Sequence, residues 1–115
     1  TVIVLRPSAP HPFEVLLVRR SDKVAFMAGA HVFPGGRVDP TDDAAPAEAC
    51  EGAATLGRCA DLSPAEEARF RVAAIRELIE EAGVLLARRH GQMVDAATAA
   101  AVRASLLPHE SFVGQ

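Results

Sequence analysis

Three glutamates, Glu77, Glu80 and Glu81, fall within five consecutive positions of the chain. In a helix, where successive residues are about 100° apart, these side chains share one face. Like charges at such spacings repel one another by roughly a few tenths of a kcal/mol per pair. Mg²⁺ would relieve that repulsion, because this hard cation prefers carboxylate and water oxygens and commonly joins carboxylates to substrate phosphates. The stretch is therefore a candidate site for such a cation and a phosphate-bearing substrate.

The same helix needs an apolar face to hold it against the rest of the protein. Its opposite side carries Ala68, Val72, Ile75, Leu78, Ile79 and Ala82. Small Ala73 leaves room above the acidic side, and Arg76 precedes Glu80 by one turn. A simpler interpretation is a solvated acidic face that Arg76 partly neutralises and that binds nothing.

The ends of this helix are marked by their residue types. Ser63 is suited to the N-cap, with Pro64 at the first helical position and Glu66 placed to complete a capping box. Gly83 follows Ala82 and is suited to end the helix. We therefore expect a helix from Ser63 to Ala82.

The other elements are expected from shorter patterns. Residues 1–6 and 13–20 predict an antiparallel pair of strands, and a brief strand begins at His31. Residues 41–62 are rich in Ala and Asp and indicate an insertion with a short helix between Pro46 and Gly57. A strand over 84–87 and an Ala-rich helix over 94–107 complete the expected order.

Composition limits the class of protein. The 115 residues are half hydrophobic and suit one domain over 1–115. A net charge of −3 argues against a nucleic-acid partner, and no apolar run approaches the roughly 20 residues of a membrane span. Two cysteines, Cys50 and Cys59, are too few for a disulfide framework and indicate a cytoplasmic protein.

The acidic stretch also carries a resemblance. Residues 76–84 read Arg-Glu-Leu-Ile-Glu-Glu-Ala-Gly-Val and match all seven specified positions in the second half of the Nudix box, R-E-U-x-E-E-x-G-U, where U is aliphatic. Pro34-Gly35-Gly36 supplies the glycine that opens the box. Over residues 1 to about 90 the chain resembles the Nudix hydrolase superfamily.

The match departs from the usual box in two places. Gly36 and Arg76 are forty residues apart instead of about fourteen, the difference being the Ala and Asp-rich insertion. Ala68 stands where a glutamate is expected eight positions before the arginine, with Glu66 and Glu67 nearby, so the structural anchor that this glutamate provides in the family is missing from that position. With this insertion, the chain resembles the Nudix subgroup that includes peroxisomal coenzyme A diphosphatases. A coenzyme A motif fits at Leu16-Leu17 and Gly29-x-x-x-Phe33-Pro34-Gly35-Gly36, but Ala25 replaces its arginine.

The resemblance implies a fold and an activity. The fold is α/β, a Nudix-type α/β/α sandwich with a mixed sheet. It is expected to be incomplete on its C-terminal side, because the insertion takes up much of the chain. The activity is hydrolysis of a nucleoside diphosphate linked to another moiety, first of all coenzyme A or acyl-coenzyme A. ADP-ribose and nucleotide sugars are alternative substrates, and a nucleotide-binding sensor without catalysis is an alternative function.

The resemblance also assigns roles by position. The metal ligands would be Glu77, Glu80, Glu81 and the Gly36 carbonyl. Arg76 would orient a carboxylate, and Glu80 or Glu81 would act as the general base. Four basic residues are candidates for contacts to the substrate phosphates: Arg19, Arg20, Lys23 and Arg37. The expected partner is a small nucleoside diphosphate, and a homodimer is left open.

Overall fold

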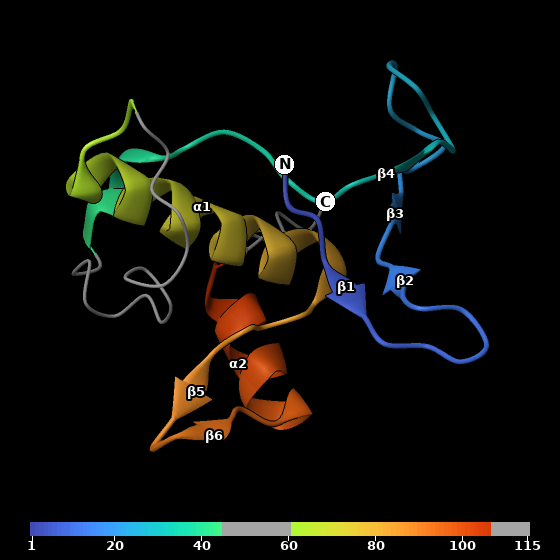
Figure 1. Ribbon diagram of the computed structural model, residues 1–115. Helices are drawn as coiled ribbons and strands as arrows, with labels where there is room; N and C mark the ends of the chain where they lie inside the picture. The colour runs from blue at the N-terminus through green and yellow to red at the C-terminus, as the bar shows by residue number, and fades with distance from the viewer. Residues whose placement is uncertain (45–60, 107–115) are drawn as a thin grey trace, which may run out of the picture.

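The computed structural model describes residues 1–44 and 61–106 (Figure 1). Along the chain the elements are β1 (Leu5–Arg6), β2 (Glu14–Val15), β3 (Val18–Arg19), β4 (His31–Val32), the short 3₁₀ helix η1 (Pro40–Ala44), α1 (Pro64–Ala82), β5 (Arg88–Arg89), β6 (Gln92–Met93) and α2 (Ala96–Leu106). The helix expected between Pro46 and Gly57 lies outside the described residues, as do Cys50 and Cys59.

The first four strands form two antiparallel pairs. β1 pairs with β2, with Leu5 opposite Val15, as the sequence predicts. The strand expected over 13–20 is divided, because its second part, β3, pairs with β4 instead. Leu16 still donates its N–H to the Val4 carbonyl at 3.0 Å, whereas Arg20 donates to the Ala30 carbonyl at 2.9 Å. The segment therefore changes partner midway along its length.

Helix α1 begins and ends as predicted. The backbone N–H of Glu66 donates to Ser63 Oγ at 3.3 Å, and Glu66 Oε2 accepts the backbone N–H of Ser63 at 2.8 Å, which completes the capping box. At the other end Gly83 adopts a left-handed conformation with φ of 69°, and its N–H donates to the Ile79 carbonyl. Leu78 and Ile79 are each 1% exposed, so the apolar face of α1 lies in the core.

The strand predicted over 84–87 is wrong. The chain instead pairs β5 with β6, Arg88 opposite Met93, across a turn in which His90 and Gly91 both have positive φ. A turn of this type needs residues that tolerate the left-handed region, and its position sets where the strands can pair. Helix α2 then begins at Ala96, two residues later than predicted, because Asp95 accepts the Thr98 N–H at 2.7 Å as a helix cap.

The segment after β4 connects the strands to the acidic side of α1. Figure 1 shows it running along α1 as far as η1. Two ion pairs fasten η1 there: Asp43 with Arg69 at 3.0 Å, and Asp42 with Arg76 at 2.8 Å. Arg69 and Arg76 are two helical turns apart, so η1 is held at two points. Within 1–44 and 61–106 no helix is both long and apolar enough to cross a membrane.

Candidate active site

Arg76 lies at the centre of a cluster of carboxylates. Its Nε and Nη2 donate to the two oxygens of Asp42 at 2.8 and 3.1 Å. Its Nη1 donates to Glu77 at 2.9 Å and to Glu80 at 3.1 Å, and Nη2 also reaches the Arg37 carbonyl at 2.9 Å. One guanidinium therefore links two of the three glutamates predicted as metal ligands to a loop 39 residues earlier in the chain.

Asp42 is the residue that sequence reasoning missed. Its side chain is 1% exposed, and hydrogen bonds from Arg76 hold the pKa of its carboxyl below the usual value despite burial. Hydrogen bonds to Asp42, and next to Glu77, in turn raise the pKa of Arg76. In the usual box the arginine follows the glycine by about fourteen positions, and the glutamate precedes that arginine by eight. The glutamate therefore stands six positions after the glycine, which in this chain is six positions after Gly36. Asp42 stands there, so the missing carboxylate at Ala68 is supplied from the other side of the insertion.

The Glu77 carboxylate lies very close to the backbone of Gly36. A Cβ built at this position would overlap the Glu77 carboxylate, whose Oε1, Cδ and Oε2 are its three nearest atoms. The absence of a side chain lets this carboxylate lie directly against the loop backbone. The structure thus brings the predicted Gly36 and Glu77 together.

We expect Gly36→Ala to displace the Glu77 carboxylate and to lower hydrolysis of a diphosphate substrate by roughly tenfold or more, as when a metal site loses its positioning groups. Gly91→Ala is a useful control, because nothing lies within 4 Å of a Cβ built there. Gly91 has a left-handed φ of 79° and Gly36 does not, so Gly91→Ala adds backbone strain without a contact, whereas Gly36→Ala adds the contact without that strain. Equal turnover by wild type and Gly36→Ala would contradict the assigned contact.

Glu81 is held differently from the other two glutamates. Its Oε2 accepts the backbone N–H of Gly35 at 3.0 Å. Among the described residues no cationic side chain forms an ion pair with Glu81, whereas Glu77 and Glu80 share Arg76. Glu81 is also exposed. It therefore lies beside the Gly-Gly turn and, among the described residues, has no arginine partner.

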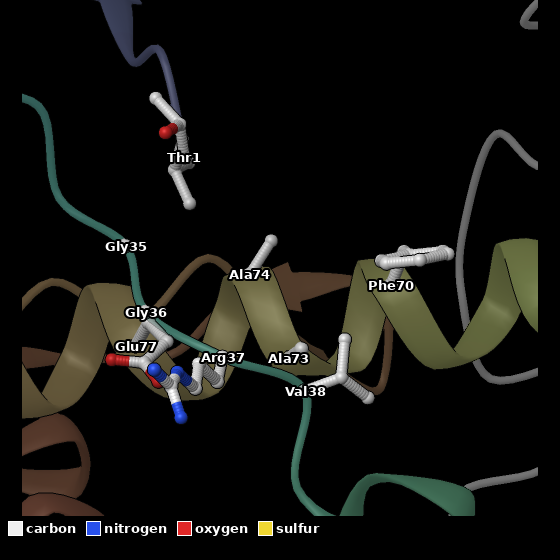
Figure 2. Close-up of a pocket in the computed structure, with 10 residues that line it drawn as sticks. Thr1, Gly35, Gly36, Arg37, Val38, Phe70, Ala73, Ala74 and Glu77 are labelled. Carbon is white, nitrogen blue, oxygen red and sulfur yellow. The ribbon is translucent and has the colours of Figure 1, made fainter.

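A pocket of about 400 Å³ lies between this turn and α1. Figure 2 shows Gly36, Arg37 and Glu77 at one end and Phe70 at the other, with Val38 between them. Ala73, 6% exposed, lies beneath the loop, so the small residue makes room for the backbone as predicted. A pocket of this volume is within the usual range for small-molecule sites.

The four predicted phosphate contacts do not lie together. Arg37 lines the pocket. Arg19 instead pairs with Asp22 at 2.8 Å, and Arg20 donates to the Phe26 carbonyl at 3.2 Å. Within the described part of the chain, neither of these arginines nor Lys23 forms a hydrogen bond or ion pair with α1. Figure 1 shows the β3–β4 loop extending away from that helix.

The residues around the turn fit a hard divalent cation in their chemistry. All the candidate ligands offer oxygen: the carboxylates of Glu77, Glu80 and Glu81, and the Gly36 carbonyl. In residues 1–44 and 61–106 no three acidic, His or Cys side chains are gathered closely enough to form a cage. Mg²⁺ does not need one, because it usually keeps several waters and takes one or two carboxylates together with substrate phosphates.

Comparisons with known proteins give a consistent result. The acyl-coenzyme A diphosphatase NUDT19 of Homo sapiens is 37% identical over 71% of this chain and 29% of its own length. The protein of the same name from Gallus gallus is 36% identical over 70% of this chain and 27% of its own. A crystal structure of a NUDIX hydrolase from Alicyclobacillus acidocaldarius is 39% identical and has a TM-score of 0.58, covering 81% of this chain and 40% of that one. No family model matches the chain.

The chain spans less than a third of the length of the two curated relatives and 40% of the solved structure. Helices and small antiparallel strands, arranged as in that structure, confirm the predicted Nudix-type α/β class, of which these residues form part. The seven-position box, the clustered glutamates and the relatives together show that the chain is similar to Nudix hydrolases.

Proposed function

We propose that this chain carries the catalytic site of a metal-dependent diphosphatase acting on coenzyme A or an acyl-coenzyme A. The observation that carries the proposal is the contact network in which Arg76 joins Asp42, Glu77 and Glu80 beside the Gly35-Gly36 turn. The substrate class is supported by the two relatives named acyl-coenzyme A diphosphatase. A single domain over 1–115, a cytoplasmic location and a homodimer remain predictions from the sequence.

In this proposal the residues of the site divide the work. Glu77, Glu80, Glu81 and the Gly36 carbonyl would hold Mg²⁺ or Mn²⁺, which, when bound, activates water and offsets the charge of the diphosphate. Arg76 keeps the Glu77 and Glu80 carboxylates oriented and neutralises part of their mutual repulsion. Glu81 is the better placed of the two predicted bases to accept a proton from the attacking water, because it lacks an arginine partner among the described residues.

The substrate's phosphates need a positive partner near the turn. Arg37 is exposed and lines the pocket beside Gly36 and Glu77, so we propose it as the phosphate contact nearest to the reaction. Arg19, Arg20 and Lys23 belong to a more distant contact region on β3 and the following loop. They would act on a part of the substrate away from the diphosphate, if a substrate spans both regions.

The substrate is tested with a panel of diphosphates. Coenzyme A, an acyl-coenzyme A, NADH, ADP-ribose and a nucleotide sugar are each incubated with the chain and Mg²⁺ or Mn²⁺, and products are separated by chromatography. We expect the two coenzyme A compounds to have the highest kcat/KM. Preference for ADP-ribose or a nucleotide sugar would overturn the substrate class while leaving the diphosphatase proposal standing. Binding without any product would instead favour a sensor.

A further inference from the structure

Helix α2 reaches the acidic turn of α1 through one side chain. Arg103 is half-buried and donates from Nε and Nη2 to the backbone carbonyl of Glu80, at 3.1 and 2.8 Å. The last carbonyls of a helix have no partner inside it, and in α1 the Ile79 carbonyl is satisfied by the Gly83 N–H. Arg103 satisfies the next carbonyl along the chain. Its charge also lies at the helix end where a cation is favoured.

The contact holds the turn at the point where the carboxylates are placed. Glu80 is held by its carboxylate, through Arg76 at 3.1 Å, and by its carbonyl, through Arg103. The carbonyl of Glu80 belongs to the same planar peptide group as the N–H of Glu81. Two N–H groups on one oxygen therefore restrict the orientation of the peptide that joins the two glutamates. The Glu81 carboxylate is in turn held to Gly35.

Helix α2 is built to keep Arg103 in place. Its first turn is capped by Asp95, which accepts the Thr98 N–H at 2.7 Å. Small residues fill the face toward α1, and Ala99 is 8% exposed, so the two helices can approach closely. The backbone that carries Arg103 is thus held by the cap of α2 and by its packing against α1.

We propose that Arg103 is a positioning residue of the active site. By donating two hydrogen bonds to the carbonyl of the Glu80–Glu81 peptide group, it sets the orientation of Glu80 and Glu81 for the divalent cation. The inference rests on the proposed function for its chemical meaning. Helix α2 lies outside the Nudix box and would contribute to the site through this residue. A lysine at this position would keep the positive charge, but it lacks the planar guanidinium whose two N–H groups donate to the same Glu80 carbonyl oxygen.

The test compares Arg103→Ala and Arg103→Lys with the wild-type full chain by Mn²⁺ binding, followed through loss of the free-ion electron paramagnetic resonance signal. We expect the dissociation constant to rise about tenfold in Arg103→Ala and to recover only in part in Arg103→Lys, as for other groups that support metal ligands. In turnover, kcat should fall with KM for the organic substrate unchanged. Ser105→Ala, exposed on α2, should behave as wild type in both measurements.

Thermal unfolding of the same proteins separates positioning from stability. If Arg103→Ala is too unstable to assay, Arg103→Lys decides, because it retains the charge at the helix end. Mn²⁺ affinity equal to wild type in folded Arg103→Ala or Arg103→Lys would overturn the inference, whatever happens to the melting temperature. A wild-type chain that binds Mn²⁺ but cleaves no diphosphate would overturn the proposed function instead. The binding comparison would still measure the effect of Arg103 in that case.

Discussion

Replacing Glu81 with Gln is expected to lower diphosphate hydrolysis by roughly 10²–10⁴-fold, the usual contribution of a positioned general base. The amide keeps the shape of the side chain and can still accept the N–H of Gly35, so the loop contact at 3.0 Å should survive. It cannot take a proton from water. The loss is therefore expected in kcat, measured by initial rates at saturating substrate and Mg²⁺.

Glu66→Gln is the matched control for this experiment. It removes a carboxylate from the first turn of the same helix, and glutamine can also complete a capping box with Ser63. Its activity should equal that of the wild type, and unfolding of both variants should show that α1 is intact. Wild-type turnover in Glu81→Gln would remove this glutamate from the reaction and shift the role of base to Glu80.

Replacing Asp42 with Ala is expected to destabilise the protein by about 3 kcal/mol, the usual cost of removing one partner of a buried ion pair, because Arg76 Nε loses its acceptor while Nη1 keeps Glu77 and Glu80. Asp42 and Arg76 side chains are 1% and 16% exposed, so water does not readily replace the lost carboxylate. Activity should fall as well, because Arg76 would no longer be fixed while it orients Glu77 and Glu80. Urea denaturation with linear extrapolation measures the change in the free energy of unfolding.

The next residue provides the comparison. Asp43 also pairs with α1, through Arg69 at 3.0 Å, but its side chain is 58% exposed. Asp43→Ala should cost no more than about 1 kcal/mol, as exposed ion pairs do. If the two variants lost equal stability, the buried Asp42–Arg76 contact would not be the anchor described above. A large loss in Asp42→Ala alone would support it.

The parts of the fold that could be predicted are those encoded locally. Ser63, Glu66 and Gly83 mark the ends of α1 by hydrogen bonds within a few residues, and the structure confirms them. The segment over 13–20 changes its pairing partner between β2 and β3. That change depends on where residues 1–6 and 30–34 approach it, and the alternation of residue types within 13–20 carries no information about this approach. The sequence analysis placed a strand on the apolar run over 84–87 and so missed the hairpin of β5 and β6. The position of that hairpin is set by the turn at His90 and Gly91, which both have positive φ.

The candidate site was predictable where the box is continuous. Residues 76–84 carry Arg76 and the three glutamates in fixed helical register, so one motif was enough to place them together. Asp42 lies 34 residues from Arg76 and Arg103 lies 23 residues from Glu80, so both contacts depend on tertiary packing. Spacing forward from Gly36 would have indicated Asp42. Nothing in the Ala-rich pattern of α2 indicates which of its residues meets α1.

The proposed site on α1 should cleave a diphosphate only when a divalent metal is present, and one time course of cleavage tests this directly. The chain is incubated with acyl-coenzyme A and Mg²⁺, excess EDTA is added while the reaction is running, and Mg²⁺ is later restored above the chelator. We predict that the diphosphate is cleaved to two phosphomonoesters, that cleavage stops with EDTA, and that it resumes with Mg²⁺. Cleavage that continues unchanged in EDTA, or no cleavage of any tested diphosphate with either metal, would contradict it.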